Sequence, residues 1–302
     1  MPEGYTHIRT AERAANMGNI KIFHKNIFFC GANGPDILFS YKVWMKGEKR
    51  GENLPLIGSR LHDENTGAFL KSIVANAKTK SQQEYVLGFL SHYAADCTIH
   101  PFIVMLTEEG MPYNREGGHG YSEIAIDSFL KKKDTGSGIV WVNYNTPKVK
   151  GEALEGAAEI LKKGIYDALG EDISNEALKA TFSHTRNLRR FFVSPLKILY
   201  CIYYLIEPIF GKRGFITGHV SPSKLKKLPS KWINPFTGEE SCDSIDELLK
   251  KAEKLSLKYM QAAVSFWEGN TSMEELMSLL GSSSYLKGIP DELSRPAFKI
   301  EE

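Results

Sequence analysis

Imidazole and carboxylate groups recur at steps of four residues in two short segments of this chain. His92, Asp96 and His100 follow one another at that step, and His119 and Glu123 repeat it. On an α-helix a step of four turns a side chain by only about 40°, so that these groups point to one side. Imidazole nitrogens and carboxylate oxygens are ligands that Zn²⁺ prefers. The spacing therefore predicts two helices that each chelate metal.

A helix-surface ion pair is the simpler interpretation of either segment alone. Both segments, however, lie in largely apolar helical patterns, SQQEYVLGFLSHYAADCTIHP (81–101) and YSEIAIDSFLKKK (121–133). Burying so many titratable groups without a metal would cost several kcal/mol for each unpaired charge. The apolar setting thus favours a metal site. A ligand set without thiolates is typical of catalytic rather than structural sites, and mixed nitrogen and oxygen ligands suit two or three close ions.

Helical periodicity dominates the rest of the chain. Two late helices begin with capping boxes, Ser244 with Glu247 and Ser272 with Glu275. Only GIVWVNY (138–144) is typical of a strand, and one strand cannot organise a fold. We therefore predict one all-α domain, a multi-helix bundle over 1–302 with at most a small β element. Residues 1–135 form its metal-ligand half and 150–302 a helical half without an assigned role. The other helices are expected at 7–18, 65–78, 151–170 and 173–192, functional loops at 31–36, 46–64 and 101–120, and an exposed tail at 295–302.

Composition excludes some partners and indicates a compartment. Lys and Arg number 38 against 36 for Asp and Glu, so nothing in the charge favours nucleic acid. The opening MPEGYTHIRTAERAAN lacks the apolar core of a signal peptide, and none of the four cysteines belongs to a CxxC pair. These features predict a cytoplasmic protein with reduced thiols.

The most apolar segment spans 189–213. Its uninterrupted part, 198–206, is far shorter than the roughly 20 residues that a membrane-spanning helix needs. We expect a buried helix here. The alternative is a surface that contacts a membrane or a partner, with basic residues at its flanks: Arg189, Arg190, Lys212 and Arg213.

The order of the candidate ligands along the chain resembles that of the bacterial zinc-dependent phospholipases C, which are related in fold to P1-type nucleases. In that family a His near the N-terminus is followed by a loop Asp, a loop His, an H-x-x-x-D helix with a further His, and an H-x-x-x-E helix. The matching segments here are YTHIRTAE, GANGPDILFS, SRLHDENTG, SHYAADCTIHPF and GGHGYSEIAID. Over roughly residues 1–130 they supply His7, Asp36, His62, His92, Asp96, His100, His119 and Glu123.

The resemblance implies two or three zinc ions. It assigns one ion to Asp36, His62, His92 and Asp96, and a second to His100, His119 and Glu123. A third would lie between His7 and Asp96, with Asp96 bridging. Asp127, four residues after Glu123, is expected either to orient a ligand imidazole or to be an ordinary surface acid. The other three histidines, His24, His184 and His219, are expected to be structural.

The activity implied is a phosphoric diester hydrolase that cleaves a phospholipid with a metal-bound hydroxide. Asp36 is the candidate for both metal ligand and proton acceptor. Peripheral membrane contact fits such a substrate, and aromatic residues would line an apolar approach to the site: Phe39, Tyr41, Trp44 and Tyr113. Two alternatives stay open. One is a P1-type nuclease or nucleotide hydrolase, and the other is a non-catalytic, metal-stabilised helical module that binds lipid or protein.

Overall fold

The computed structural model describes residues 4–45, 47–210, 214 and 216–294. The predicted tail at 295–302 and the flanking Lys212 and Arg213 lie outside these residues. The prediction of an all-α fold is confirmed, since helices make up nearly all the regular structure described. Among the described residues, the one sheet is an antiparallel hairpin of β1 (Trp232–Ile233) and β2 (Glu240–Ser241).

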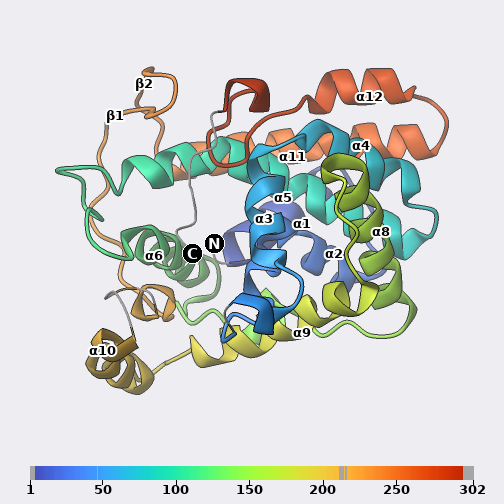
Figure 1. Ribbon diagram of the computed structural model, residues 1–302. Helices are drawn as coiled ribbons and strands as arrows, with labels where there is room; N and C mark the ends of the chain where they lie inside the picture. Colours follow the sequence, from blue (N-terminus) through green and yellow to red (C-terminus); the bar gives the residue numbers. More distant parts are fainter. Residues whose placement is uncertain (1–3, 46, 211–213, 215, 295–302) are drawn as a thin grey trace.

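Helix α5 (Lys80–Met105) runs through the middle of the molecule (Figure 1). It begins at a capping box formed by Thr79 and Gln82. Three helices pack against it: α1 (Gly4–Met17), α2 (Lys25–Gly31) and α11 (Ile245–Trp267). A side chain at Gly88 would place its Cβ 2.2 Å from the carbonyl oxygen of Phe28, so this glycine lets α2 approach α5 closely.

The N-terminal half contains six further helical elements among the described residues. They are the 3₁₀ helices η1 (Gly34–Ser40) and η2 (Gly47–Arg50), and the helices α3 (Leu54–Asp63), α4 (Thr66–Asn76), α6 (Gly118–Thr135) and α7 (Val142–Asn145). Much of the expected loop at 46–64 is therefore helical. The strand expected at 138–144 is wrong, because Val142 begins α7. At the end of α7, the backbone carbonyl oxygen of Asn145 accepts hydrogen bonds from the side chains of Asn33 and Arg189.

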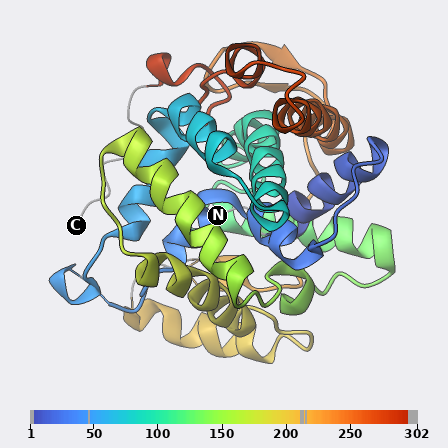
Figure 2. The same ribbon diagram turned by 90° about the vertical axis from the view of Figure 1, so that its right-hand side faces the viewer.

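The C-terminal half wraps around the N-terminal half. Helix α8 (Glu152–Leu169) packs on α4, and α9 (Asn175–Phe191) packs on α8 and η1. Figure 2 shows α8 on the outside of this face, with α9 below it. Helix α12 (Met273–Leu280) contacts α11 and α4, and the short η3 (Thr217–His219) and η4 (Asp291–Leu293) lie in the connections. Both predicted capping boxes, at the starts of α11 and α12, are confirmed.

Two hydrophobic clusters fill the interior. The larger contains residues from both halves of the chain, from Ile8 to Tyr285. The smaller joins α6 and the end of α5 to the start of α11 and to β1, whose Trp232 packs on Phe102. Among the described residues, no helix is both long and apolar enough to cross a membrane.

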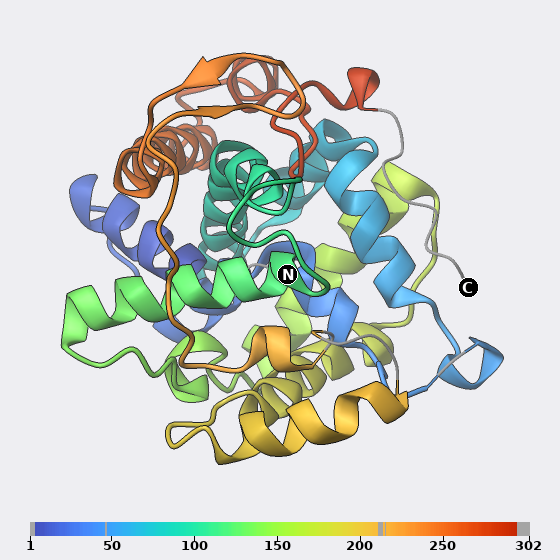
Figure 3. The ribbon, with the colours of Figure 1, turned by 90° about the vertical axis from the view of Figure 1, so that its left-hand side faces the viewer.

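Helix α10 (Ile198–Phe210) departs from the prediction of a buried apolar helix. Much of it is exposed at the periphery of the molecule, on the far side of α6 from the β hairpin (Figures 1 and 3). Leu205 is 75% exposed and Ile209 is 77% exposed. The apolar run therefore forms a surface, as in the alternative that the sequence left open.

Candidate metal centre

Five elements bring the eight candidate ligands to one place. Helix α1 carries His7, η1 carries Asp36, α3 carries His62, α5 carries three of them and α6 carries two. Seven of the eight side chains are at most 4% exposed, whereas His119 is 38% exposed. The group is therefore an interior cluster that reaches solvent at His119.

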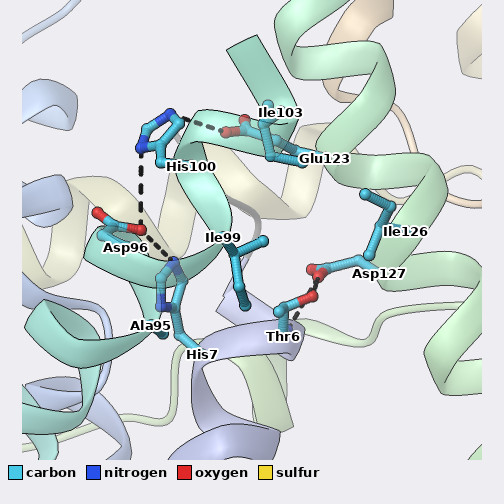
Figure 4. A pocket seen from close by; sticks show the side chains of 10 residues that line it. All are labelled: Thr6, His7, Ala95, Asp96, Ile99, His100, Ile103, Glu123, Ile126 and Asp127. Carbon is cyan, nitrogen blue, oxygen red and sulfur yellow. Dashed lines mark hydrogen bonds and ion pairs between the residues drawn. The ribbon is translucent and has the colours of Figure 1, made fainter. Parts of the chain in front are cut away.

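Asp96 lies at the centre of the first part of the cluster. Its Oδ2 is 3.1 Å from Nε2 of His92 and 3.9 Å from Nε2 of His62. Its Oδ1 is 3.3 Å from Nε2 of His7 and 4.0 Å from Nδ1 of His100, contacts that Figure 4 shows. One carboxylate thus contacts imidazoles from α1, α3 and α5.

The second part of the cluster lies between α5 and α6. The Nε2 atoms of His100 and His119 are 3.0 Å apart. Glu123 places its Oε1 2.9 Å from Nε2 of His119 and 3.7 Å from Nε2 of His100. These distances bring the three side chains around one point, which is the ligand set expected for the second zinc ion.

Three groups of ligand atoms are close enough to share an ion, with all atoms of a group within 4.8 Å of one another. They are His7–Asp36–His92, His62–His92–Asp96 and His100–His119–Glu123. Asp36 also lies beside His62, with its Oδ1 3.1 Å from Nε2. Two ligands of a tetrahedral zinc ion lie about 3.4 Å apart, given metal–ligand bonds near 2.1 Å. Several of the observed separations match this value.

The hydrogen bonds of His62 and His92 turn ring nitrogens toward the centre. Nδ1 of His62 lies 2.6 Å from the carbonyl oxygen of Gly58, and Nδ1 of His92 lies 3.2 Å from that of Ala32. A carbonyl only accepts, so each Nδ1 carries a proton. In a neutral ring, Nε2 then directs a lone pair toward a carboxylate oxygen. Two acceptors that face each other favour a cation between them.

Electrostatics keeps the donor atoms in the state that binds a cation. Burial lowers the pKa of His7 to about 4, and burial also lowers that of His100 to about 4, so both rings are neutral at pH 7. Burial opposes ionisation of the carboxylates, but the nearby imidazoles hold the pKa of Asp36, Asp96 and Glu123 below the ordinary values. Burial opposes protonation of His92 as well, but the carboxylates of Asp96 and Asp36 raise its pKa. The cluster thus combines ionised carboxylates with two imidazoles, His7 and His100, whose pKa is lowered.

Several buried polar atoms in the cluster have no hydrogen-bond partner in the protein, which fits a bound metal ion. Within the described part of the chain, Nδ1 of His7, Oδ2 of Asp36 and Nδ1 of His100 have no hydrogen-bond partner. A cavity of about 30 Å³ adjoins His7, Asp96, His100 and Glu123 (Figure 4). Such a volume holds one or two small species the size of a water molecule. Buried polar atoms rarely lack partners, so the donor set fits divalent cations.

Asp127 holds the helix that carries His7. Its carboxylate accepts hydrogen bonds from the backbone amides of Tyr5 and Thr6, both at 2.9 Å, and from Oγ1 of Thr6 at 2.5 Å. The side chain is only 1% exposed, so the expectation of an ordinary surface acid is wrong. These bonds fix the start of α1 and so orient His7. The four-residue spacing between Glu123 and Asp127 did not predict them.

A polar network behind η1, which sequence reasoning missed, positions Asp36. Buried Arg189 donates from Nη1 to Oδ1 of Asn33 at 2.6 Å and to Oγ1 of Thr146 at 2.7 Å. Gly34 has a φ of +53°, and a Cβ there would come within 2.2 Å of the His92 ring. The loop therefore packs directly over this histidine, and glycine suits both the conformation and the contact.

The three histidines outside the pattern lie elsewhere. His24 contacts Glu84, with Nδ1 2.9 Å from Oε2. His184 accepts from the backbone amide of Lys42 and packs on Trp44. His219 packs on Phe192. None of the three belongs to a candidate metal group among the described residues.

Comparison with protein-family models gave a match to one described as "Zinc dependent phospholipase C", over residues 6–185. That span is more than half of the chain and contains all eight candidate ligands. The chain belongs to the zinc-dependent phospholipase C family. Comparison with curated proteins gave no match, and comparison with solved structures gave none.

Membership of the zinc-dependent phospholipase C family agrees with the geometry on two points. The family is a family of hydrolases, so the chain is a phospholipase-like hydrolase. The family is zinc-dependent, and the clustered His, Asp and Glu side chains are groups that can hold metal ions. The partition of ligands among individual ions stays a prediction.

Proposed function

We propose that the chain is a zinc-dependent phosphoric diester hydrolase that cleaves a phospholipid in the manner of a phospholipase C. One observation carries the proposal: eight buried or half-buried ligand side chains from five elements converge around Asp96 and Glu123. A structural zinc site needs four ligands and closes them around one ion. Eight ligands, with His119 open to solvent, suit several ions and an open coordination position.

The chain's own groups suggest which residues would hold the ions. His62, His92 and Asp96, with Asp36 beside them, form one set, and His100, His119 and Glu123 form another. His7, next to Asp96, belongs to a third. Zinc ions bound there would neutralise charge on the phosphoryl oxygens and lower the pKa of a bound water toward ~7.

Asp36 is the candidate proton acceptor. Although burial opposes its ionisation, His92 and His62 keep its pKa below the ordinary value, so the carboxylate is charged at neutral pH. Its Oδ1 faces His62, while Oδ2 is buried without a hydrogen-bond partner among the described residues. Oδ2 is therefore the atom placed to accept a proton from water.

A phospholipid suits the surroundings of the site better than a nucleotide does. An apolar cavity of about 580 Å³ lies between η1, α9, α10 and η3, and its lining includes Phe39, Trp44, Phe191 and Tyr203. The ring of Phe39 is 5.5 Å from the ring of His62, so the cavity borders the ligand cluster. Acyl chains would find apolar surface there, next to the groups that act on the phosphate.

Metal content and substrate range together test the proposal. Protein purified without added metal should contain two or three equivalents of zinc by elemental analysis. It should hydrolyse both a chromogenic phosphodiester and phosphatidylcholine. Cleavage of single-stranded DNA but not of phosphatidylcholine would favour the nuclease alternative. Zinc without any hydrolysis would favour a non-catalytic module.

Two substitutions sharpen the test. Asp96→Asn should lose zinc and activity together, since this carboxylate contacts imidazoles of three helices. His184→Gln should keep its zinc, because His184 packs on Trp44 away from the cluster. Equal zinc loss in both variants would refute the assignment of the ligands.

A further inference from the structure

Helix α10 exposes a row of large apolar side chains. The α10 ridge, as we call it, consists of Leu196 just before the helix and of Ile198, Ile202, Leu205 and Ile209 on it. Their exposed fractions are 81%, 59%, 46%, 75% and 77%. The four helical positions follow steps of four, three and four, which places them on one face. A continuous exposed apolar face of this kind is uncommon on a monomeric protein and marks an interaction surface.

The opposite side of α10 is firmly attached, so the ridge is held outward. Buried Glu207 accepts hydrogen bonds from the backbone amides of Ile216 at 2.5 Å and Thr217 at 3.0 Å, and from Oγ1 of Thr217 at 2.8 Å. Tyr203 donates from its hydroxyl to the carbonyl oxygen of Phe191 at 3.0 Å. These bonds tie the helix to η3 and to the end of α9.

The surroundings of the ridge are strongly basic. Between residues 186 and 231 the sequence has ten Lys and Arg residues and one acid, Glu207, although the whole chain is nearly balanced. That acid is buried in the hydrogen bonds just described. A groove of about 590 Å³ beside the start of α10 is lined in part by Lys132, Lys197 and Lys224. Six of the bases are exposed among the described residues: Arg190, Lys197, Lys224, Lys226, Lys227 and Lys231. The exposed charge of this segment is therefore positive.

The helix that carries the ridge also contributes to the apolar cavity beside the metal centre. Tyr203 of α10 lines the apolar cavity that also contains Phe39, whose ring packs near His62. On the far side, His219 of η3 lines the same cavity and sits against Gly120, the residue after His119. Helix α10 therefore borders, through Tyr203, the same cavity that reaches Phe39 and η3.

We propose that the α10 ridge inserts into the interface of an anionic phospholipid bilayer, with the neighbouring lysines on the head groups. A helix of 13 residues is about 20 Å long and lies in the plane of the interface rather than across the membrane. Charge decides between this partner and a second copy of the chain. Two copies meeting at the ridge would bring two basic surfaces together, whereas anionic lipid complements them.

Sedimentation of the full-length protein with vesicles tests the docking surface. Binding to vesicles containing phosphatidylglycerol should be at least tenfold tighter than binding to phosphatidylcholine vesicles, and it should weaken as salt is raised. The double variant Ile202→Glu, Leu205→Glu should reduce binding at least tenfold. The matched control Ile233→Glu, at a residue 55% exposed on the β hairpin away from α10, should bind like the wild type.

Two further measurements separate this inference from the proposed function. The double variant should hydrolyse a soluble chromogenic diester at the wild-type rate, and Asp96→Asn should still bind vesicles. Wild-type vesicle binding by the double variant would overturn the inference. So would a dimer of the wild type, in sedimentation velocity without lipid, that the double variant abolishes.

Discussion

The metal centre and the α10 ridge both depart from the usual rule that polar side chains are exposed and apolar ones buried. The centre buries carboxylates and imidazoles, and the ridge exposes isoleucine and leucine. Both arrangements cost free energy in the isolated chain. The centre is embedded among five packed elements, whereas α10 is attached along one side. The comparison indicates that each region is built for something outside the chain, a cation in one case and a lipid surface in the other.

Metal removal should have the largest effect and should affect only the buried region. Stripping zinc with a chelator leaves three ionised carboxylates close together without compensation, so the midpoint of thermal unfolding should fall by roughly 10 °C. Hydrolysis should stop, and added zinc should restore both properties. Differential scanning calorimetry with elemental analysis provides the measurement. An unchanged midpoint in zinc-free protein would mean that the cluster does not depend on metal.

A matched pair of buried glutamates tests whether position in the cluster matters. Glu123→Gln should lose about one equivalent of zinc and reduce kcat/KM on a soluble diester by about 10²-fold or more. Glu84 is also fully buried and contacts a histidine, His24, but it lies outside the cluster. Glu84→Gln should therefore lower stability without changing zinc content. Similar zinc loss in the two variants would contradict the ligand assignment.

A pair of threonines on α1 tests the support that Asp127 gives to His7. Thr6→Val removes the hydroxyl bond to Asp127 and should cost about 1 kcal/mol of unfolding free energy, with a several-fold fall in activity. Thr10→Val removes a comparable buried bond, from Oγ1 to the carbonyl oxygen of Thr6. It should cost a similar amount of stability yet leave the activity close to wild type. Chemical denaturation and steady-state kinetics measure the two effects.

Substitution of the ridge should have the smallest effect on folding. Leu205 is 75% exposed, so Leu205→Ser should change the free energy of unfolding by less than about 0.5 kcal/mol. A loss of several kcal/mol, measured by denaturant titration, would show that the ridge packs within the molecule and would remove the contrast between the two regions.

The chelating faces of α5 and of α6 were each accessible from sequence because groups four residues apart share a helix face. His92, Asp96 and His100 needed only a regular helix to point together. The capping boxes of α11 and α12 were equally local. The contact between Asp127 and Thr6 was not predictable, since 121 residues separate the two and either side chain alone is ordinary.

Two of the errors have different physical causes. The apolar run in 138–144 looked like a strand, but no described strand is available to pair with it, and polar contacts of Asn145 fix a turn of helix instead. Apolar composition predicted burial for 198–206, but composition does not say whether an apolar side chain is covered by protein or by lipid. The same isoleucines suit a protein core or a lipid interface.

The bonds from Asp127 to Tyr5 and Thr6 also have a consequence for biosynthesis. When residues 1–100 have been synthesised, His7 has already emerged from the ribosome, but Asp127, whose carboxylate anchors the helix of His7, has not yet been made. The nascent chain therefore carries its first imidazole long before the partner that orients it. The finished pocket can form only after α6 has emerged, so the last steps of its assembly must wait for translation to pass that point.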